Sequence, residues 1–244
     1  MKYILLILYP FIGTIIGSFL VFFLKKEINE KIEKIMIGLS SGVMLSASLW
    51  SLLIPSLEYS INLGFLKWIP PVLGFILGII ILISIDNFLS RYKDNKMLMP
   101  LVVTIHNIPE GLAVGVLVVN AIINNDISSY MSALTLSLGV AIQNIPEGAI
   151  ISLTLKTKKT NKIKAFIIGV LSGVVEPLSI LVTLLFVSII SKVLPYTLSF
   201  AAAAMIYVVI EELLPQGLDN KSKLLIITFT IGFIIMMLLD IMFG

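Results

Sequence analysis

The stretch from residue 98 to residue 120, LMPLVVTIHNIPEGLAVGVLVVN, decides the fold class of this chain. A helix needs about 20 predominantly apolar residues to cross the hydrocarbon core of a bilayer. This stretch is long enough, contains neither Lys nor Arg, and carries one acidic residue, Glu110, near its middle. We therefore predict a membrane-spanning helix with an intramembrane carboxylate.

The rest of the chain repeats this apolar pattern. Of its 244 residues, 58% are hydrophobic and 13% are charged, whereas soluble domains are about 45–50% apolar and about 25% charged. The first apolar stretch lacks an A-x-A cleavage pattern and is expected to remain as a span. We predict an all-α polytopic membrane protein, a single transmembrane domain over residues 1–244, with eight spans near 3–24, 35–57, 68–89, 98–120, 128–155, 163–190, 194–214 and 224–243.

Two residue counts narrow the chemistry. The sequence has no cysteine, which excludes disulfides, iron–sulfur clusters and thiolate zinc sites. Its one histidine, His106, excludes any site that needs several imidazoles. The pI near 9.0 does not indicate nucleic-acid binding, because the basic residues lie in short segments between the apolar stretches.

These basic residues predict the orientation of the chain. Cytoplasmic loops of membrane proteins collect Lys and Arg. Fourteen of the seventeen basic residues lie in four segments that an eight-span topology places on one side, residues 25–34, 90–97, 156–164 and 215–223. This side is therefore expected to be cytoplasmic, and both termini are expected outside the cytoplasm.

The single Arg against sixteen Lys indicates an AT-rich genome, and hence a bacterial inner (plasma) membrane.

A six-residue motif occurs twice. HNIPEG covers residues 106–111 and QNIPEG covers residues 143–148, with five of six positions identical. The two predicted spans run in opposite directions, which indicates an antiparallel pair about a pseudo-two-fold axis. Inverted symmetry with interrupted helices at the bilayer midplane is typical of transporter binding sites.

The spacing inside each motif favours a cation site. Residues four apart share one helix face, so His106 and Glu110 point the same way, as do Gln143 and Glu147. The proline of each motif is expected to bend its helix and to free carbonyl groups beside these side chains. Carboxylates, an imidazole and amide oxygens suit Zn²⁺, Cd²⁺, Fe²⁺ or Mn²⁺, and oxygen-rich sites also admit Mg²⁺.

Three further polar residues are predicted near this site. Asn107 and Asn144 follow the first residue of each motif and can bind a cation or hydrogen-bond the carboxylates. Glu176 precedes Pro177 near the centre of the sixth span. Intramembrane carboxylates are costly and need partners, yet no Lys or Arg lies at their depth. Protons shared between carboxylates are one alternative, and a bound cation is the one we favour.

At these motifs the sequence resembles the ZIP (Zrt/Irt-like protein) family of divalent-metal transporters. Gln143, which stands in place of a second histidine, makes the second motif similar to that of the GufA-like bacterial branch. The resemblance covers the whole chain. It implies a 3+2+3 helix bundle with inverted repeats and a binuclear metal centre. One metal position is implied for His106, Glu110, Gln143 and Glu147. The other is implied for Asn107, Glu110, Asn144, Glu147 and Glu176, with Glu110 and Glu147 bridging. Asn144 departs from relatives with aspartate there, because it adds no negative charge.

The route of the metal is predicted from spacing and from the resemblance. Met44, Ser51 and Glu58 are seven residues apart and share one face of the second span. The resemblance makes Glu58 and Asp240 entrance acids, places Ser51 near the site and puts Met44 on the inner path. Glu211 and Glu212 end the seventh span as a predicted exit pair. Close helix contacts are predicted at small residues, namely Gly38, Gly42, Gly74, Gly78 and Ala201 to Ala204.

The resemblance implies import of divalent metal ions, with zinc first and cadmium, iron and manganese as alternatives. The expected partners are metal ions and the lipid bilayer, not nucleic acid, and a homodimer stays open. An intramembrane metal-dependent hydrolase is the main alternative, although the chain has no H-E-x-x-H motif and no E-x-x-H pair. A proton or alkali-cation channel and a purely structural protein are the others.

Overall fold

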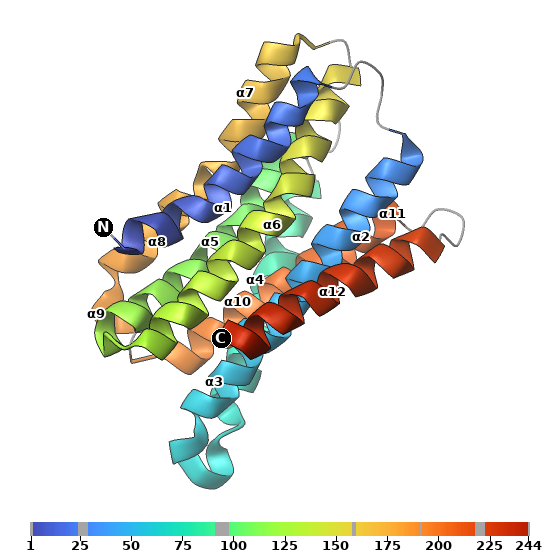
Figure 1. The fold of residues 1–244 in the computed structure, drawn as a ribbon. Coiled ribbons are helices and arrows are strands. Elements are labelled where there is room, and N and C mark those ends of the chain that lie inside the picture. Colours follow the sequence, from blue (N-terminus) through green and yellow to red (C-terminus); the bar gives the residue numbers. More distant parts are fainter. Residues whose placement is uncertain are drawn as a thin grey trace.

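The computed structural model describes residues 2–23, 29–90, 98–157, 160–190, 192–217 and 223–243. Helices and short turns make up this part of the chain, which contains no strand (Figure 1). The prediction of an all-α polytopic membrane protein is confirmed. Eight described segments are long and apolar enough to cross a membrane: Tyr3–Phe22, Glu30–Tyr59, Ile69–Phe88, Asn107–Asn124, Ile127–Leu155, Lys162–Leu185, Leu194–Glu211 and Lys223–Phe243.

The spans are assembled from the following elements. The first three spans contain α1 (Lys2–Phe19), η1 (Leu20–Phe22), α2 (Glu30–Ala47), η2 (Ser48–Leu53), α3 (Ile54–Tyr59) and, after η3 (Ile61–Leu66), α4 (Ile69–Ser90). The middle two are α5 (Leu98–Asn124) and α6 (Ile127–Thr157). The last three contain α7 (Lys162–Gly173), α8 (Val175–Leu185), α9 (Val187–Ile190), α10 (Leu194–Val208), η4 (Val209–Leu213), α11 (Leu214–Gly217) and α12 (Lys223–Phe243).

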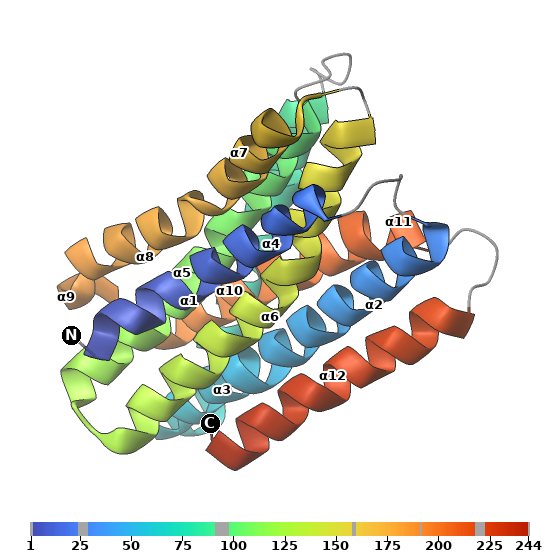
Figure 2. The same ribbon diagram turned by 45° about the horizontal axis from the view of Figure 1, so that its top comes forward.

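These helices pack as two groups (Figures 1 and 2). The motif group consists of α1, α5, α6, α7 and α8, and it holds both repeated motifs. The flanking group consists of α2, η2, α3, α4, α10 and α12. The groups meet where α2 packs on α6 and α10 packs on α5. Each motif helix therefore faces the interface between the groups.

The helix pairs follow an inverted repeat. α1 packs along α6 while α8 packs along α5, and α12 packs along α2 while α4 packs along α10. Exchanging the first three spans with the last three, and the fourth with the fifth, converts each pair into another. The second and seventh spans also share a π-helical segment, η2 and η4, followed by Pro55 and Pro215 respectively. This is the arrangement that a 3+2+3 bundle predicts.

Glycines allow the paired helices to touch through their backbones. A Cβ atom at Gly17 of α1 would overlap the carbonyl oxygen of Ile145 in α6, and one at Gly42 of α2 would overlap that of Phe229 in α12. Small residues at such interfaces let helix axes approach closely. The predicted close contacts are confirmed at four glycines, Gly38, Gly42, Gly74 and Gly78.

The prolines of the fourth, fifth and sixth spans differ in whether their helices are interrupted. α5 continues through Pro109 and α6 continues through Pro146 without a break. The interruption lies instead in the sixth span, where α7 ends at Gly173 and α8 begins two residues before Pro177. Proline at the first turn of a helix loses no intrahelical hydrogen bond, so a helix start just before Pro177 is favourable. It leaves Glu176 in the first turn of α8.

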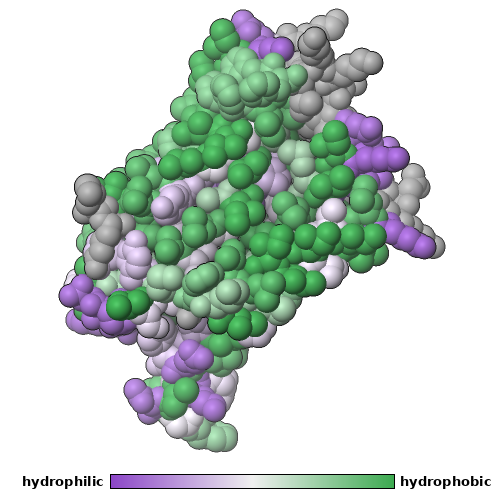
Figure 3. Space-filling view, viewed as in Figure 1, coloured by the Kyte–Doolittle hydropathy of each residue, from purple (hydrophilic) through white to green (hydrophobic). Residues whose placement is uncertain are grey.

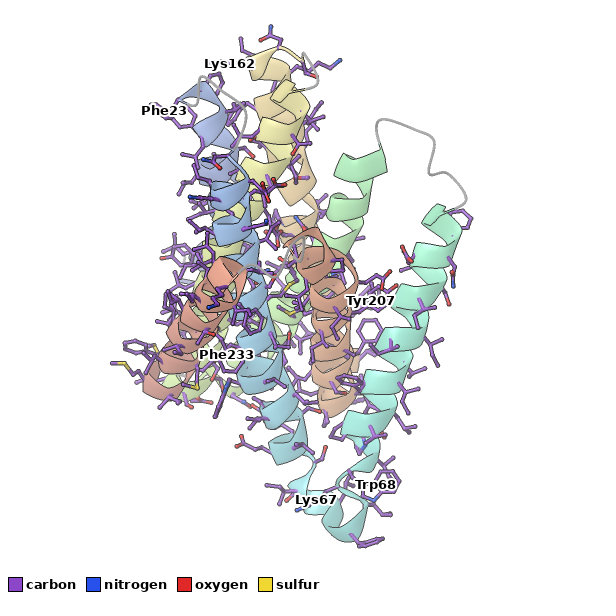
Figure 4. All side chains as sticks on the ribbon, turned by 90° about the vertical axis from the view of Figure 1, so that its right-hand side faces the viewer. Phe23, Lys67, Trp68, Lys162, Tyr207 and Phe233 are labelled. Atoms are coloured by element: carbon purple, nitrogen blue, oxygen red, sulfur yellow. The ribbon has the colours of Figure 1, made fainter. Side chains whose placement is uncertain are left out.

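The surface of the bundle suits a bilayer. Apolar residues cover its sides, and hydrophilic residues gather toward its ends (Figure 3). The outward faces of α4 and α12 carry exposed large side chains such as Ile76 and Ile231. Lys162, from a segment predicted to be cytoplasmic, and Lys67, from one predicted to be outside, lie at opposite ends of the bundle (Figure 4). The chain is therefore a multi-pass membrane protein whose polar segments lie at two separate ends.

Candidate metal centre

Three helices of the motif group bring the intramembrane acids together. Glu110 lies on α5, Glu147 on α6 and Glu176 on α8. Glu110 interacts electrostatically with both other carboxylates, and Glu176 also interacts with Glu147. Their exposed fractions are 1%, 8% and 0%. Three buried carboxylates that interact in this way repel one another when ionised, so protons or a cation must offset their charge.

The two motif asparagines hold the carboxylate of Glu176. Nδ2 of Asn107 donates a hydrogen bond to Oε1 at 3.0 Å, and Nδ2 of Asn144 donates to Oε2 at 2.8 Å. Both amides are buried. With the donors turned toward Glu176, the Oδ1 atom of each asparagine has no hydrogen-bond partner. These two oxygens remain available to bind a cation.

Helix α1 contributes two contacts that the sequence did not predict. Oγ1 of Thr14 lies 3.5 Å from Oε1 of Glu176, and the carbonyl oxygen of Pro10 accepts from Nδ2 of Asn144 at 3.1 Å. Thr14 fits because Gly148 and Gly173 have no side chains where it packs. A threonine and a proline in an apolar helix are ordinary packing residues by pattern, so no signal in the sequence distinguishes them.

Buried oxygen atoms without hydrogen-bond partners gather at the repeated motifs. In folded proteins the large majority of buried polar atoms are hydrogen-bonded. Carbonyl and carboxylate oxygens carry lone pairs that a cation can use, so a cation suits a set of such atoms. At the two motifs these atoms belong to side chains that are at most 2% exposed, and they are Asn107 Oδ1, Glu110 Oε2, Asn144 Oδ1, and both Oε1 and Nε2 of Gln143, whose side chain also interacts with Glu110. Two further atoms of this kind, Ser46 Oγ and Asp240 Oδ2, lie outside the motifs.

The donor set mixes amides with carboxylates. The described side chains include no group of three His, Cys, Asp or Glu arranged to hold a metal ion. The side chain of His106, the only imidazole of the chain, lies outside the described residues. Among the described side chains, the groups at the motifs that can bind a cation are therefore the amide oxygens of Asn107, Gln143 and Asn144 and the carboxylates.

The flanking group reaches the motifs through Ser40 of α2. Its Oγ lies 3.2 Å from Oε1 of Glu147 and 3.3 Å from the carbonyl oxygen of Gln143. The side chain of Ser40 is fully buried. The sequence did not predict this contact, because α2 contains several serines and nothing in their spacing singles out Ser40.

The acids predicted at the entrance share one cavity. Oγ of Ser51 donates to Oδ1 of Asp240 at 2.5 Å. Both residues line a cavity of about 240 Å³ together with Glu58 and with Ser132 of α6. The cavity therefore lies between the two helix groups, and Ser51 is placed with the entrance acids.

Of the other predicted pathway residues, the two with described side chains, Met44 and Glu211, do not line this cavity. Met44 is fully buried and belongs to the hydrophobic core of the bundle. Glu211 lies in the π-helical segment η4 and is exposed. The side chain of Glu212 lies outside the described residues.

Comparison with known proteins identifies the family. A family model described as ZIP Zinc transporter matches residues 96–240. Zinc transporter ZIP11 of Xenopus tropicalis is 31% identical, over 95% of this chain and 94% of that protein. The chain belongs to the ZIP zinc transporter family.

Bacterial ZIP proteins are similar to the chain as well. Zinc transporter ZupT of Chlorobaculum parvum is 30% identical, over 95% of this chain and 91% of that protein. Zinc transporter GufA of Myxococcus xanthus is 31% identical, over 62% of this chain and 57% of that protein. Membership of the ZIP family supports a divalent-metal transporter rather than an enzyme, so the metal-dependent hydrolase is set aside.

Proposed function

We propose that this ZIP family member carries Zn²⁺ into the cytoplasm across a bacterial inner membrane, through a metal site on α5, α6 and α8. Zn²⁺ accepts nitrogen and oxygen ligands, and Cd²⁺, Fe²⁺ and Mn²⁺ compete for ligands of these types. The whole chain acts as one transmembrane transporter domain. The names of its relatives, which are zinc transporters, support zinc as the first substrate to test.

The observation that carries this proposal is the cluster of buried oxygens without partners on the two motif helices. In the proposed site Glu110 and Glu147 bridge two metal positions. His106 and Gln143 complete the first position. The second draws on Asn107, Asn144 and Glu176. The electrostatic repulsion among the three glutamates is what one or two divalent cations would relieve.

The same proposal gives the remaining acids a role along the route. Glu58 and Asp240 collect metal at the outer cavity, where Ser51 hydrogen-bonds Asp240. Met44 lies on the inner path, and Glu211 with Glu212 receives the ion at the cytoplasmic end. Metal ligands must be deprotonated to bind, so loading the site releases protons and uptake falls at acidic pH.

Radiolabelled Zn²⁺ uptake into proteoliposomes tests the site. The double variant Glu110→Ala/Glu147→Ala removes both proposed bridging ligands, and we expect saturable uptake by the wild type to be lost. The matched control is Glu30→Ala/Glu33→Ala, which removes two carboxylates from the first turn of α2 and should leave uptake intact.

Three outcomes would count against the proposal. Uptake that survives in the double variant would overturn the site but keep the transport function. Absence of uptake by folded wild type across Zn²⁺, Cd²⁺, Fe²⁺ and Mn²⁺ would overturn the transport of these ions. Equal loss in the Glu30→Ala/Glu33→Ala control would show that any pair of lost carboxylates has this effect.

The proposed orientation has its own test. The natural chain has no cysteine, so single substitutions Lys67→Cys and Lys162→Cys report opposite ends of the bundle. We expect a membrane-impermeant maleimide to label Lys67→Cys in intact cells and Lys162→Cys only after lysis. The reverse labelling pattern would place both termini in the cytoplasm.

A further inference from the structure

At the candidate metal centre the hydroxyl of Ser40 makes hydrogen-bond contacts across the two helix groups. Asn107, Asn144 and Thr14 reach Glu176 from within the motif group. Ser40 reaches Glu147 from α2, in the flanking group. The flanking group thus touches a carboxylate of the site directly, although it carries none of the predicted mid-membrane ligands.

The geometry leaves Glu147 able to bind a cation while it keeps this contact. The hydroxyl proton of Ser40 has two acceptors, Oε1 of Glu147 at 3.2 Å and the carbonyl oxygen of Gln143 at 3.3 Å. An ionised carboxylate offers about four lone-pair positions, so one hydrogen bond does not block metal binding. Ser40 is fully buried, which keeps water from replacing the contact.

We propose that Ser40 is a positioning residue for the metal-binding carboxylate of Glu147, contributed by the opposite helix group. This inference rests on the proposed function, because it takes Glu147 as a ligand. Hydrogen bonds to a metal ligand set its orientation, and their loss typically costs about 10–100-fold in metal affinity. Ser40 supplies such a bond to Glu147.

The position of Ser40 has a consequence for transport. A relative shift of α2 against α6 by one helical turn, about 5.4 Å, would separate Oγ of Ser40 from the Glu147 carboxylate. The affinity of the site for metal would then depend on how the two helix groups are aligned. Metal would be held more tightly in the alignment of this structure than in a shifted one.

Ser41 provides a matched control on the same helix. It is adjacent to Ser40 and also fully buried, but its hydroxyl donates to the carbonyl oxygen of Ile37 within α2 at 2.7 Å. Ser40→Ala and Ser41→Ala each remove one buried oxygen at neighbouring positions of α2. They differ in whether that oxygen contacts the metal centre.

The experiment measures Zn²⁺ affinity of detergent-purified protein by competition with a fluorescent chelator, together with the KM and kcat of uptake into proteoliposomes. We expect Ser40→Ala to weaken affinity about 10–100-fold and to raise KM, while Ser41→Ala matches the wild type. Without metal, the melting temperatures of the two variants should agree. On a Glu147→Gln background, Ser40→Ala should cause no further loss of affinity, since it acts through Glu147.

Several results would overturn the inference. They are an unchanged affinity in Ser40→Ala, an equal loss in Ser41→Ala, and a further loss when Ser40→Ala is combined with Glu147→Gln. The Glu147→Ala variant separates this failure from that of the proposed function. If Glu147→Ala transports normally, the proposed site itself is wrong. If Glu147→Ala is inactive and Ser40→Ala binds normally, the role of Ser40 alone is wrong.

Discussion

Nδ2 of Asn144 lies 2.8 Å from Oε2 of Glu176, and both atoms belong to buried side chains. Asn107 of the first motif donates to the other oxygen of the same carboxylate. Each copy of the repeated motif therefore supplies one amide donor to a single acid on a third helix. An aspartate at position 144 would supply a negative charge in place of this donor.

Asn144→Asp is therefore expected to destabilise the protein when no metal is bound. The variant loses a hydrogen bond and places a carboxylate against Glu176, a cost of about 1–3 kcal/mol for the lost partner alone. A divalent cation offsets the added charge, so Zn²⁺ should raise the melting temperature of Asn144→Asp more than that of the wild type. Melting in detergent with chelator and with Zn²⁺ measures both effects.

The matched control for this prediction is Asn62→Asp, which makes the same change in the exposed segment η3. It should alter neither the melting temperature in chelator nor the response to Zn²⁺. If Asn144→Asp melts like the wild type in chelator, the contact with Glu176 does not stabilise the fold.

Gly17 tests the contact of α1 with α6. A Cβ atom there would overlap the backbone carbonyl of Ile145, which cannot move without shifting α6 and the motif that it carries. Overpacking of this kind costs about 1–3 kcal/mol, so Gly17→Ala should lower the melting temperature and the rate of metal uptake.

Gly139→Ala is the comparison for Gly17→Ala. Gly139 lies on α6, and a Cβ atom there would meet the side chain of Met236, which is flexible and can rearrange. We expect a much smaller effect on melting and uptake than for Gly17→Ala. Equal effects at the two positions would mean that the backbone contact between α1 and α6 is no more important for stability and uptake than the contact at Gly139.

The surroundings of Asp126, at the start of α6, predict that the stability of the fold depends on pH. Its carboxylate accepts hydrogen bonds from the backbone N–H of Ser129 at 2.7 Å and from the Ser129 hydroxyl at 3.0 Å. These bonds favour the ionised form and lower the pKa of Asp126 below its ordinary value. The charged carboxylate thus stabilises the fold fully above the unfolded pKa of about 3.9, and the stabilisation is lost as pH falls through the lower folded pKa.

Asp126→Asn measures this contribution, because asparagine keeps an acceptor oxygen but cannot ionise. We expect the wild type to melt at a higher temperature than Asp126→Asn above about pH 5 and the difference to shrink as the pH falls below about 3.9. A difference that stays constant over this range would show that the charge of Asp126 adds nothing to its hydrogen bonds.

Much of the fold could be predicted from the sequence because membrane-spanning helices satisfy their own backbone hydrogen bonds. Length and apolar character alone identify the eight spans. A motif repeated in adjacent spans singles out Glu110 and Glu147 as candidate ligands of a cation. Neither Pro109 nor Pro146 interrupts its helix, since α5 and α6 continue through them, and the bend expected at each proline stays a prediction. The π-helical segments η2 and η4 were not predicted, because a π turn depends on how a helix packs rather than on a pattern of residues.

By itself, the sequence determined that this is an eight-span membrane protein with acids placed where an apolar environment makes an unpartnered charge costly. Only the tertiary structure decided which groups meet those acids. Thr14 and Glu176 are separated by 162 positions in the chain, and Ser40 and Glu147 by 107. Contacts at such separations arise from helix packing, where Gly148 and Gly173 make room for Thr14, and a local pattern of residue types carries no record of them.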